Sequence, residues 1–134
     1  MYYPLVLQQV SDGYVVLVPD VAGCYSAGDT FAEALANAKQ AIEFHVESLV
    51  EDGEEIPKPA DIAVHQQNPE YQQADLFFAI VEVDLTHLLG KAEKINVSLP
   101  TRLIRKIDDY VASHPEYKSR SGFLAKVATD KIFA

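Results

Sequence analysis

Residues 94–100 narrow the possible folds of this chain more than any other stretch of its sequence. Apolar and polar side chains alternate here, so a β-strand would have one apolar face and one polar face. The apolar set is Ile95, Val97 and Leu99, and the polar set is Lys94, Asn96 and Ser98. Pro100 has no N–H for a strand ladder, and its fixed φ suits the first position of a helix. The sequence therefore predicts a strand that leads directly into a helix.

After this strand, apolar residues recur every three or four positions in two segments, which predicts two amphipathic helices. The first carries apolar side chains from Leu103 onward and should end near His114. The second should begin at Ser119 or Ser121, since either serine can cap a helix. The whole unit, residues 93–134, is close to the length of about 40 residues below which a chain rarely buries a core alone. We therefore expect two copies to associate.

Two of these segments, Lys94–Pro100 and Ser119–Leu124, resemble the strand and the second-helix start of a ribbon-helix-helix DNA-binding domain. The resemblance implies a homodimer whose paired strands enter the major groove of an operator that is an inverted repeat. The base-reading residues it implies are Lys94, Asn96 and Ser98, and the phosphate-binding residues are Ser119, Arg120 and Ser121. The dimer core it implies is Ile95, Val97, Leu99, Ile107, Phe123 and Val127.

Charge is distributed unevenly along the chain. Residues 1–90 have two basic and fifteen acidic side chains, a net charge of −13, whereas residues 91–134 have nine basic and five acidic side chains, a net charge of +4. A basic module suits nucleic acid, and an acidic one is repelled by it. We therefore expect an acidic domain at residues 1–84, a linker at 85–92 and a DNA-binding domain at 93–134.

Overall composition is that of an ordinary globular protein, with 49% hydrophobic and 23% charged residues. Apolar runs are too short for a membrane span, and the first residues lack the basic start of a signal peptide, so we expect a cytoplasmic protein. One cysteine, Cys24, excludes an internal disulfide. The four histidines are His45, His65, His87 and His114. They lack metal-ligand spacing, so we expect packing or surface roles and neither metal nor cofactor.

The acidic domain has the pattern of an α+β fold in the order βββα, loop, β. Asp12-Gly13 between two β-rich runs predicts a hairpin, and residues 23–27 read as a third strand. Thr30 and Glu33 form a capping box that begins a long helix. Gly53 can end this helix in the left-handed conformation. An irregular, proline-rich and glutamine-rich connection then precedes a buried strand at 76–81, and a helical turn is expected at 86–89.

Several short motifs in this domain resemble the signature of HicB antitoxins. They are Tyr14-Val15-Val16, Pro19-Asp20-Val21-Ala22-Gly23-Cys24, Gly28-Asp29-Thr30 and Glu33-Ala34-Leu35-Ala36-Asn37-Ala38. The resemblance implies a partial ribonuclease H-like domain that binds and occludes HicA, a small basic toxin that cleaves messenger RNA. It also implies repression of the operon's own promoter. One departure is Val21-Ala22, where the family usually has Leu-Pro, and this bears on loop shape.

Two other functions compete with this one. Asp12, Asp20, Asp29 and Asp75 would have to hold Mg²⁺ in a ribonuclease H-like nuclease, but each has a local structural reason to be acidic. Cys24 has no histidine nearby to activate it as a nucleophile. A ligand-sensing ribbon-helix-helix repressor is the other alternative, although no residue pattern names a ligand. We expect a chain without enzymatic activity. The sequence leaves open which face of residues 1–84 contacts the toxin and whether dimers pair into tetramers through that domain.

Overall fold

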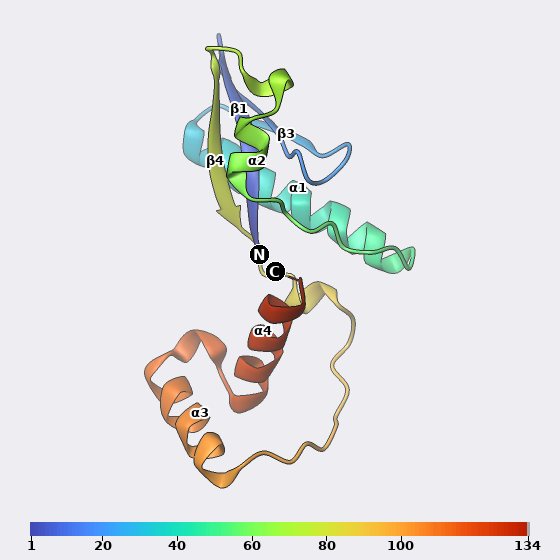
Figure 1. The fold of residues 1–134 in the computed structure, drawn as a ribbon, viewed down its shortest axis with the longest axis vertical. Helices are drawn as coiled ribbons and strands as arrows, with labels where there is room; N and C mark the ends of the chain where they lie inside the picture. The colour runs from blue at the N-terminus through green and yellow to red at the C-terminus, as the bar shows by residue number, and fades with distance from the viewer. Residues whose placement is uncertain (134) are drawn as a thin grey trace. The chain divides into compact units, whose positions relative to one another are not determined.

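A computed structural model describes residues 1–133 of the chain, which form two compact units, Met1–Leu89 (unit 1) and Gly90–Ala134 (unit 2) (Figure 1). The described part is a mixed α+β structure with one four-stranded sheet and four α-helices. Unit 1 holds the whole sheet, and unit 2 is helical.

Four antiparallel strands make the sheet of unit 1, in the order β3-β2-β1-β4. Their bounds are β1 Tyr2–Val10, β2 Gly13–Leu17, β3 Tyr25–Gly28 and β4 Leu76–Glu82. Leu7 of β1 lies between Val16 of β2 and Phe77 of β4, and Val6 lies between Leu17 and Phe78. The sheet thus brings the fourth strand, far away in sequence, beside the first.

The β1–β2 hairpin forms as predicted, but its turn lies one residue earlier than the Asp12-Gly13 pair. Val10 pairs with Gly13, so the two turn residues are Ser11 and Asp12. Gly13 enters the ladder with a φ of +154°, which favours glycine, and a Cβ there would lie 2.3 Å from the carbonyl oxygen of Gly28. Glycine is needed for close approach to the neighbouring chain segment, and this need shifts the register by one residue.

Helix α1, Phe31–Glu51, begins and ends with the caps that its sequence predicts. The Thr30 hydroxyl accepts a hydrogen bond from the Glu33 N–H at 3.1 Å. At the other end Gly53 has a φ of +73°, and the N–H of Glu54 donates to the Leu49 carbonyl at 2.9 Å. These are the marks of a Schellman motif, so both ends of α1 have backbone partners.

The core of unit 1 lies between α1 and one face of the sheet. Strand alternation sends Tyr3, Leu5 and Leu7 to this face, and all three are fully buried. The helix contributes Ala34, Ala38, Ile42 and Val46, which are also fully buried. Val83 and Leu85 follow β4 and are 0% and 1% exposed, so the core of unit 1 includes part of the segment that we expected to be linker.

Cys24 lies in the loop before β3 and is fully buried. Burial raises the pKa of its thiol, because desolvation disfavours the thiolate. Its N–H donates to the Val21 carbonyl at 3.1 Å, and its own carbonyl accepts from the Val18 N–H at 3.1 Å. Cys24 therefore packs as a small apolar residue in a tight loop.

The proline-rich and glutamine-rich connection contains helical turns that the sequence reading missed. They are α2, Ile62–Gln66, and the 3₁₀ turn η1, Pro69–Tyr71. Asp61 and Asn68 cap them by accepting from the N–H groups of Ala63 and Glu70 at 2.9 and 3.0 Å. Both are too short for a periodic signal. The turn expected at 86–89 is present as η2, Thr86–Leu88.

Unit 2 contains α3, Thr101–Ser113, the turn η3, Pro115–Tyr117, and α4, Arg120–Phe133. Ser119 is the capping serine, since its hydroxyl accepts from the Gly122 N–H at 3.0 Å. The strand expected at 94–100 is not present in a single copy, where residues 91–100 form neither helix nor strand, and its pairing across a dimer stays a prediction. A strand needs a neighbour for its backbone N–H and C=O groups, and one copy of unit 2 supplies none.

Candidate functional site

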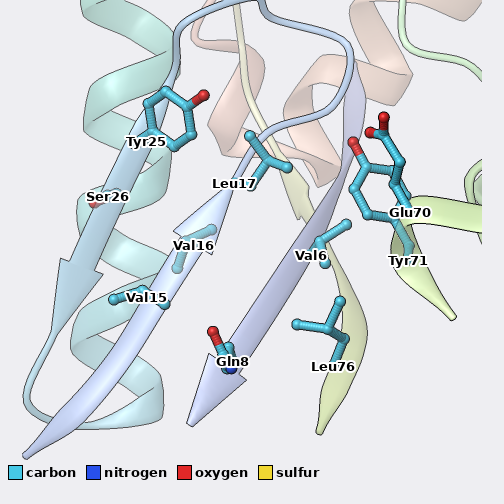
Figure 2. Close-up of a pocket in the computed structure, with 10 residues that line it drawn as sticks. All are labelled: Val6, Gln8, Val15, Val16, Leu17, Tyr25, Ser26, Glu70, Tyr71 and Leu76. Atoms are coloured by element: carbon cyan, nitrogen blue, oxygen red, sulfur yellow. The ribbon is translucent and has the colours of Figure 1, made fainter. Parts of the chain in front are cut away.

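The sheet face opposite α1 carries a hollow of about 490 Å³ (Figure 2). Its lining consists of Val6, Gln8, Val15, Val16, Leu17, Tyr25, Ser26, Glu70, Tyr71 and Leu76. Figure 2 shows Tyr25 and Leu17 on one side of the hollow and Glu70 and Tyr71 on the other. Tyr25 is 69% exposed, so a large aromatic ring stands free beside an apolar depression. Such surfaces are typical of binding sites.

Strand register explains how residues far apart in sequence reach this hollow. Val6 pairs with Leu17, and Leu17 in turn pairs with Tyr25, so the three side chains stand in a row across β1, β2 and β3. Gln8 lies between Val15 and Leu76 in a second row. The sequence predicts that Tyr25 lies in a strand, but the grouping of Tyr25 with these residues depends on strand order, which the sequence does not reveal.

The η1 side of the hollow, and the neighbouring α2, are fixed to the rest of unit 1. His65 Nε2 lies 2.8 Å from Asp20 Oδ2, and these side chains are only 12% and 9% exposed. The Tyr71 ring packs edge-to-face on Phe78 of β4, with centroids 6.3 Å apart. Burial raises the pKa of the Tyr71 phenol, and the carboxylates of Glu70 and Asp20 raise it further. The hollow is therefore a preformed feature with acidic surroundings.

The four aspartates of the nuclease alternative have separate local roles. Asp12 is in the hairpin turn, Asp29 directly precedes the capping Thr30, and Asp20 pairs with His65. Asp75 accepts a hydrogen bond from the Gln8 side chain at the far end of β1. Within residues 1–133 no three His, Cys, Asp or Glu side chains gather in a group that could hold a metal ion.

The predicted DNA-reading residues of unit 2 are all exposed, as are two of their three apolar neighbours. Lys94, Asn96 and Ser98 lie in the extended segment 91–100. Ile95 and Val97 in the same segment are 73% and 62% exposed. The apolar side chains that are expected to pack against a second copy are thus uncovered in a single copy. Leu99 is half-buried.

The predicted phosphate site at residues 119–121 lies at the start of α4, and its arginine already has a partner. Arg120 donates two hydrogen bonds to the Asp108 carboxylate, from Nε at 3.0 Å and from a terminal nitrogen at 2.8 Å. These bonds lower the pKa of Asp108 and raise that of Arg120. Arg120 therefore links α4 to α3, a role that the sequence did not suggest.

Four aromatic rings fill the turn between α3 and α4. The His114 ring stacks on Tyr110 with centroids 3.9 Å apart, and Tyr117 and Phe123 pack edge-to-face at 5.2 Å. Of the residues expected in the dimer core, Ile107 is buried and Phe123 half-buried, but Val127 is 46% exposed. His114 thus has the packing role expected of it, and unit 2 folds around a small internal cluster.

A profile of the HicB-like antitoxins of bacterial toxin–antitoxin systems matches residues 3–128. The chain belongs to this family. A relative of this HicB-like chain, a 14.9 kDa protein from the rep-hol intergenic region of Haemophilus phage HP1, is 53% identical over 134 residues, which are 100% of this chain and 99% of the relative.

Two solved structures of HicB proteins are similar to this HicB-like chain. The antitoxin HicB of Burkholderia pseudomallei is 42% identical with a TM-score of 0.73, and the alignment covers 96% of both chains. A chain in the HicA3 and HicB3 toxin–antitoxin complex is 32% identical with a TM-score of 0.57, and the alignment covers 63% of this chain and 99% of that chain. No helix within residues 1–133 combines the length and apolarity needed to cross a bilayer.

Proposed function

We propose that this HicB-like antitoxin binds a HicA-like toxin through unit 1 and represses its own operon through a dimeric unit 2, both in the cytoplasm. Unit 1 is then a partial ribonuclease H-like domain that acts by covering the toxin, without catalysis. Unit 2 is a ribbon-helix-helix domain once two copies pair. The domain limits, the site residues and the tetramer remain predictions.

Charge and the family comparison support the toxin half of the proposal. Residues 1–90 carry a net charge of −13, which favours fast encounter with a basic partner. The aligned chain in the HicA3 and HicB3 complex corresponds to 63% of this chain, an extent close to that of unit 1. A toxin contact confined to unit 1 agrees with both observations.

The observation that carries the DNA-binding half is the exposure of large apolar side chains in unit 2. Ile95, Val97, Val127 and Ile132 are between 46% and 73% exposed in a unit of about 45 residues. A second copy whose segment 94–99 pairs antiparallel with the first would cover these side chains and supply the missing strand partners. It would also bring two sets of Lys94, Asn96 and Ser98 to one surface.

Copurification tests the toxin half. The protein encoded by the neighbouring gene should copurify with the full chain and lose its messenger-RNA cleavage on binding. Cleavage that continues in the purified complex would contradict neutralisation by occlusion.

The chain alone should leave RNA and RNA–DNA hybrid intact in the presence of Mg²⁺. Cleavage that is abolished by Asp20→Asn would favour the nuclease alternative instead.

Gel-shift titration tests the DNA half with two neighbouring substitutions. Asn96→Ala should cost about 1 to 3 kcal/mol of operator affinity for each hydrogen-bonded base that it no longer reaches, with little effect on random DNA. Val97→Asp should abolish binding to both DNAs, because a buried charge prevents pairing of the apolar faces. Sedimentation should show monomers for Val97→Asp and dimers for the matched control Asn96→Asp. Equal weakening on both DNAs by Asn96→Ala would exclude it as a base reader.

A further inference from the structure

The hollow on the sheet face opposite α1 has the properties of a preformed docking site. One side is the regular β1–β2–β3 surface with Val6, Leu17 and Tyr25. The opposite side, Glu70 and Tyr71, is held by the 2.8 Å His65–Asp20 pair and by the Tyr71–Phe78 ring contact. Binding there requires little ordering of the protein, which is a main cost of association.

Two side chains of the hollow, both largely apolar, are exposed to solvent. Tyr25 and Val15 are 69% and 40% exposed, and both flank side chains that are largely buried. Tyrosine is enriched at the centres of protein interfaces because its ring is apolar and its hydroxyl can still form hydrogen bonds. A volume of about 490 Å³ accommodates a few side chains of a partner.

Charge distinguishes between the candidate occupants. None of the ten residues that line the hollow is basic, and Glu70 lies at its rim. The Asp75 carboxylate accepts a hydrogen bond from Gln8, which lines the hollow, and the Asp20 carboxylate acts electrostatically on Tyr71. A second copy of unit 1 would bring residues with a net charge of −13 against an equal charge. A basic partner instead gains attraction and can place a cation over the Tyr25 ring.

We propose that this hollow is where unit 1 holds its basic protein partner: an apolar side chain of the partner enters between Leu17 and Tyr71, and a neighbouring Lys or Arg lies against Tyr25 and Glu70. The inference rests on the proposed function and assigns the toxin contact to one face of unit 1. It places α1, on the other side of the sheet, outside the contact.

Calorimetry with the purified product of the neighbouring gene tests the assignment on the full chain. Tyr25→Lys should weaken binding by about 30-fold or more, the loss typical of a central interface aromatic. Phe44→Lys is the matched control, since Phe44 is 71% exposed on the outer face of α1 and the charge change is the same. It should change affinity less than about twofold. Val15→Lys, also in the hollow, should behave like Tyr25→Lys.

The binding data of the variants decide whether the partner docks in the hollow. Thermal unfolding verifies that the variants remain folded, as expected for exposed positions. If the wild-type chain binds and the hollow variants bind equally well, or if Phe44→Lys alone loses affinity, the partner docks elsewhere and the inference is wrong while the proposed function stands. If the wild-type chain does not bind this partner, the proposed function itself fails.

Glu70→Gln should reduce the salt dependence of binding, and an unchanged dependence would exclude the charged contact.

Discussion

Lys118 has a backbone conformation that is costly for a residue with a Cβ. Its φ is +67° and its ψ −39°, and the Ser119 N–H donates to the Tyr117 carbonyl at 2.8 Å, which closes a three-residue turn. The turn points that carbonyl at α4, where a Cβ on Gly122 would lie only 2.0 Å from it. Strain at Lys118 and the absence of a side chain at Gly122 together allow α4 to begin directly after η3.

Replacing Lys118 with glycine should therefore stabilise unit 2. Lys118→Gly removes the Cβ and its strain, and the expected gain is about 1 kcal/mol in the free energy of opening, after the extra chain entropy of glycine is subtracted. Lys118→Ala is the control, because it removes the charge but keeps the Cβ. Hydrogen exchange of the α3 and α4 amides in the full chain measures the difference. Equal protection in the two variants would show that the turn is unstrained.

Helix ends could be predicted from the sequence, because the residues that cap a helix lie within a few positions of it. The Thr30 cap, the Gly53 end and the capping Ser119 all depend on neighbours within a few residues, and each is present. The segment 94–99 differs, because its hydrogen-bond partners are not in one chain. The hollow could not be predicted either, since Tyr25 and Tyr71 reach its two sides only through the strand order and through a turn without periodicity.

The ion pair between Arg120 of α4 and Asp108 of α3 should make the stability of unit 2 depend on pH. Arg120 holds the pKa of Asp108 below its unfolded value of about 3.9. The stabilisation is therefore fully present above that unfolded value and is lost as the pH falls through the lower folded pKa. Asp108→Asn should lower the melting temperature at pH 7 and have a diminishing effect below about pH 4.

Asp109→Asn is the matched control for this link. Asp109 is the next residue on the same helix and is exposed. Its substitution changes the net charge equally without breaking the two bonds to Arg120. A similar loss of stability in both variants, or a loss for Asp108→Asn that does not vary with pH, would indicate a general charge effect.

Across the whole molecule, the charge division coincides with the structural division. Unit 1 has its own sheet, helix and core, and unit 2 carries the excess of basic side chains. Because Leu85 is buried in unit 1, a fragment should end at residue 89 and not at the sequence-based limit of 84. The proposed function then assigns the toxin to unit 1 and operator DNA to unit 2.

A fragment of residues 1–89 should fold and bind the toxin with an affinity close to that of the full chain, but it should not bind operator DNA. Calorimetry with the toxin and gel shifts with the operator measure the two activities, and circular dichroism verifies the fold. A folded fragment that has lost toxin binding would show that the contact extends into unit 2.

The buried position of Cys24 has a practical consequence for following these two partners in solution. The thiolate is the form that attacks alkylating reagents, and Cys24 is both inaccessible and shifted towards its thiol form. Thiol reagents should therefore leave the native chain unlabelled. A cysteine introduced by Ala92→Cys in unit 2, outside the proposed base-reading set, or by Ser48→Cys on the exposed side of α1, would take up a fluorophore at that position alone, and the anisotropy of this fluorophore should rise when a partner binds.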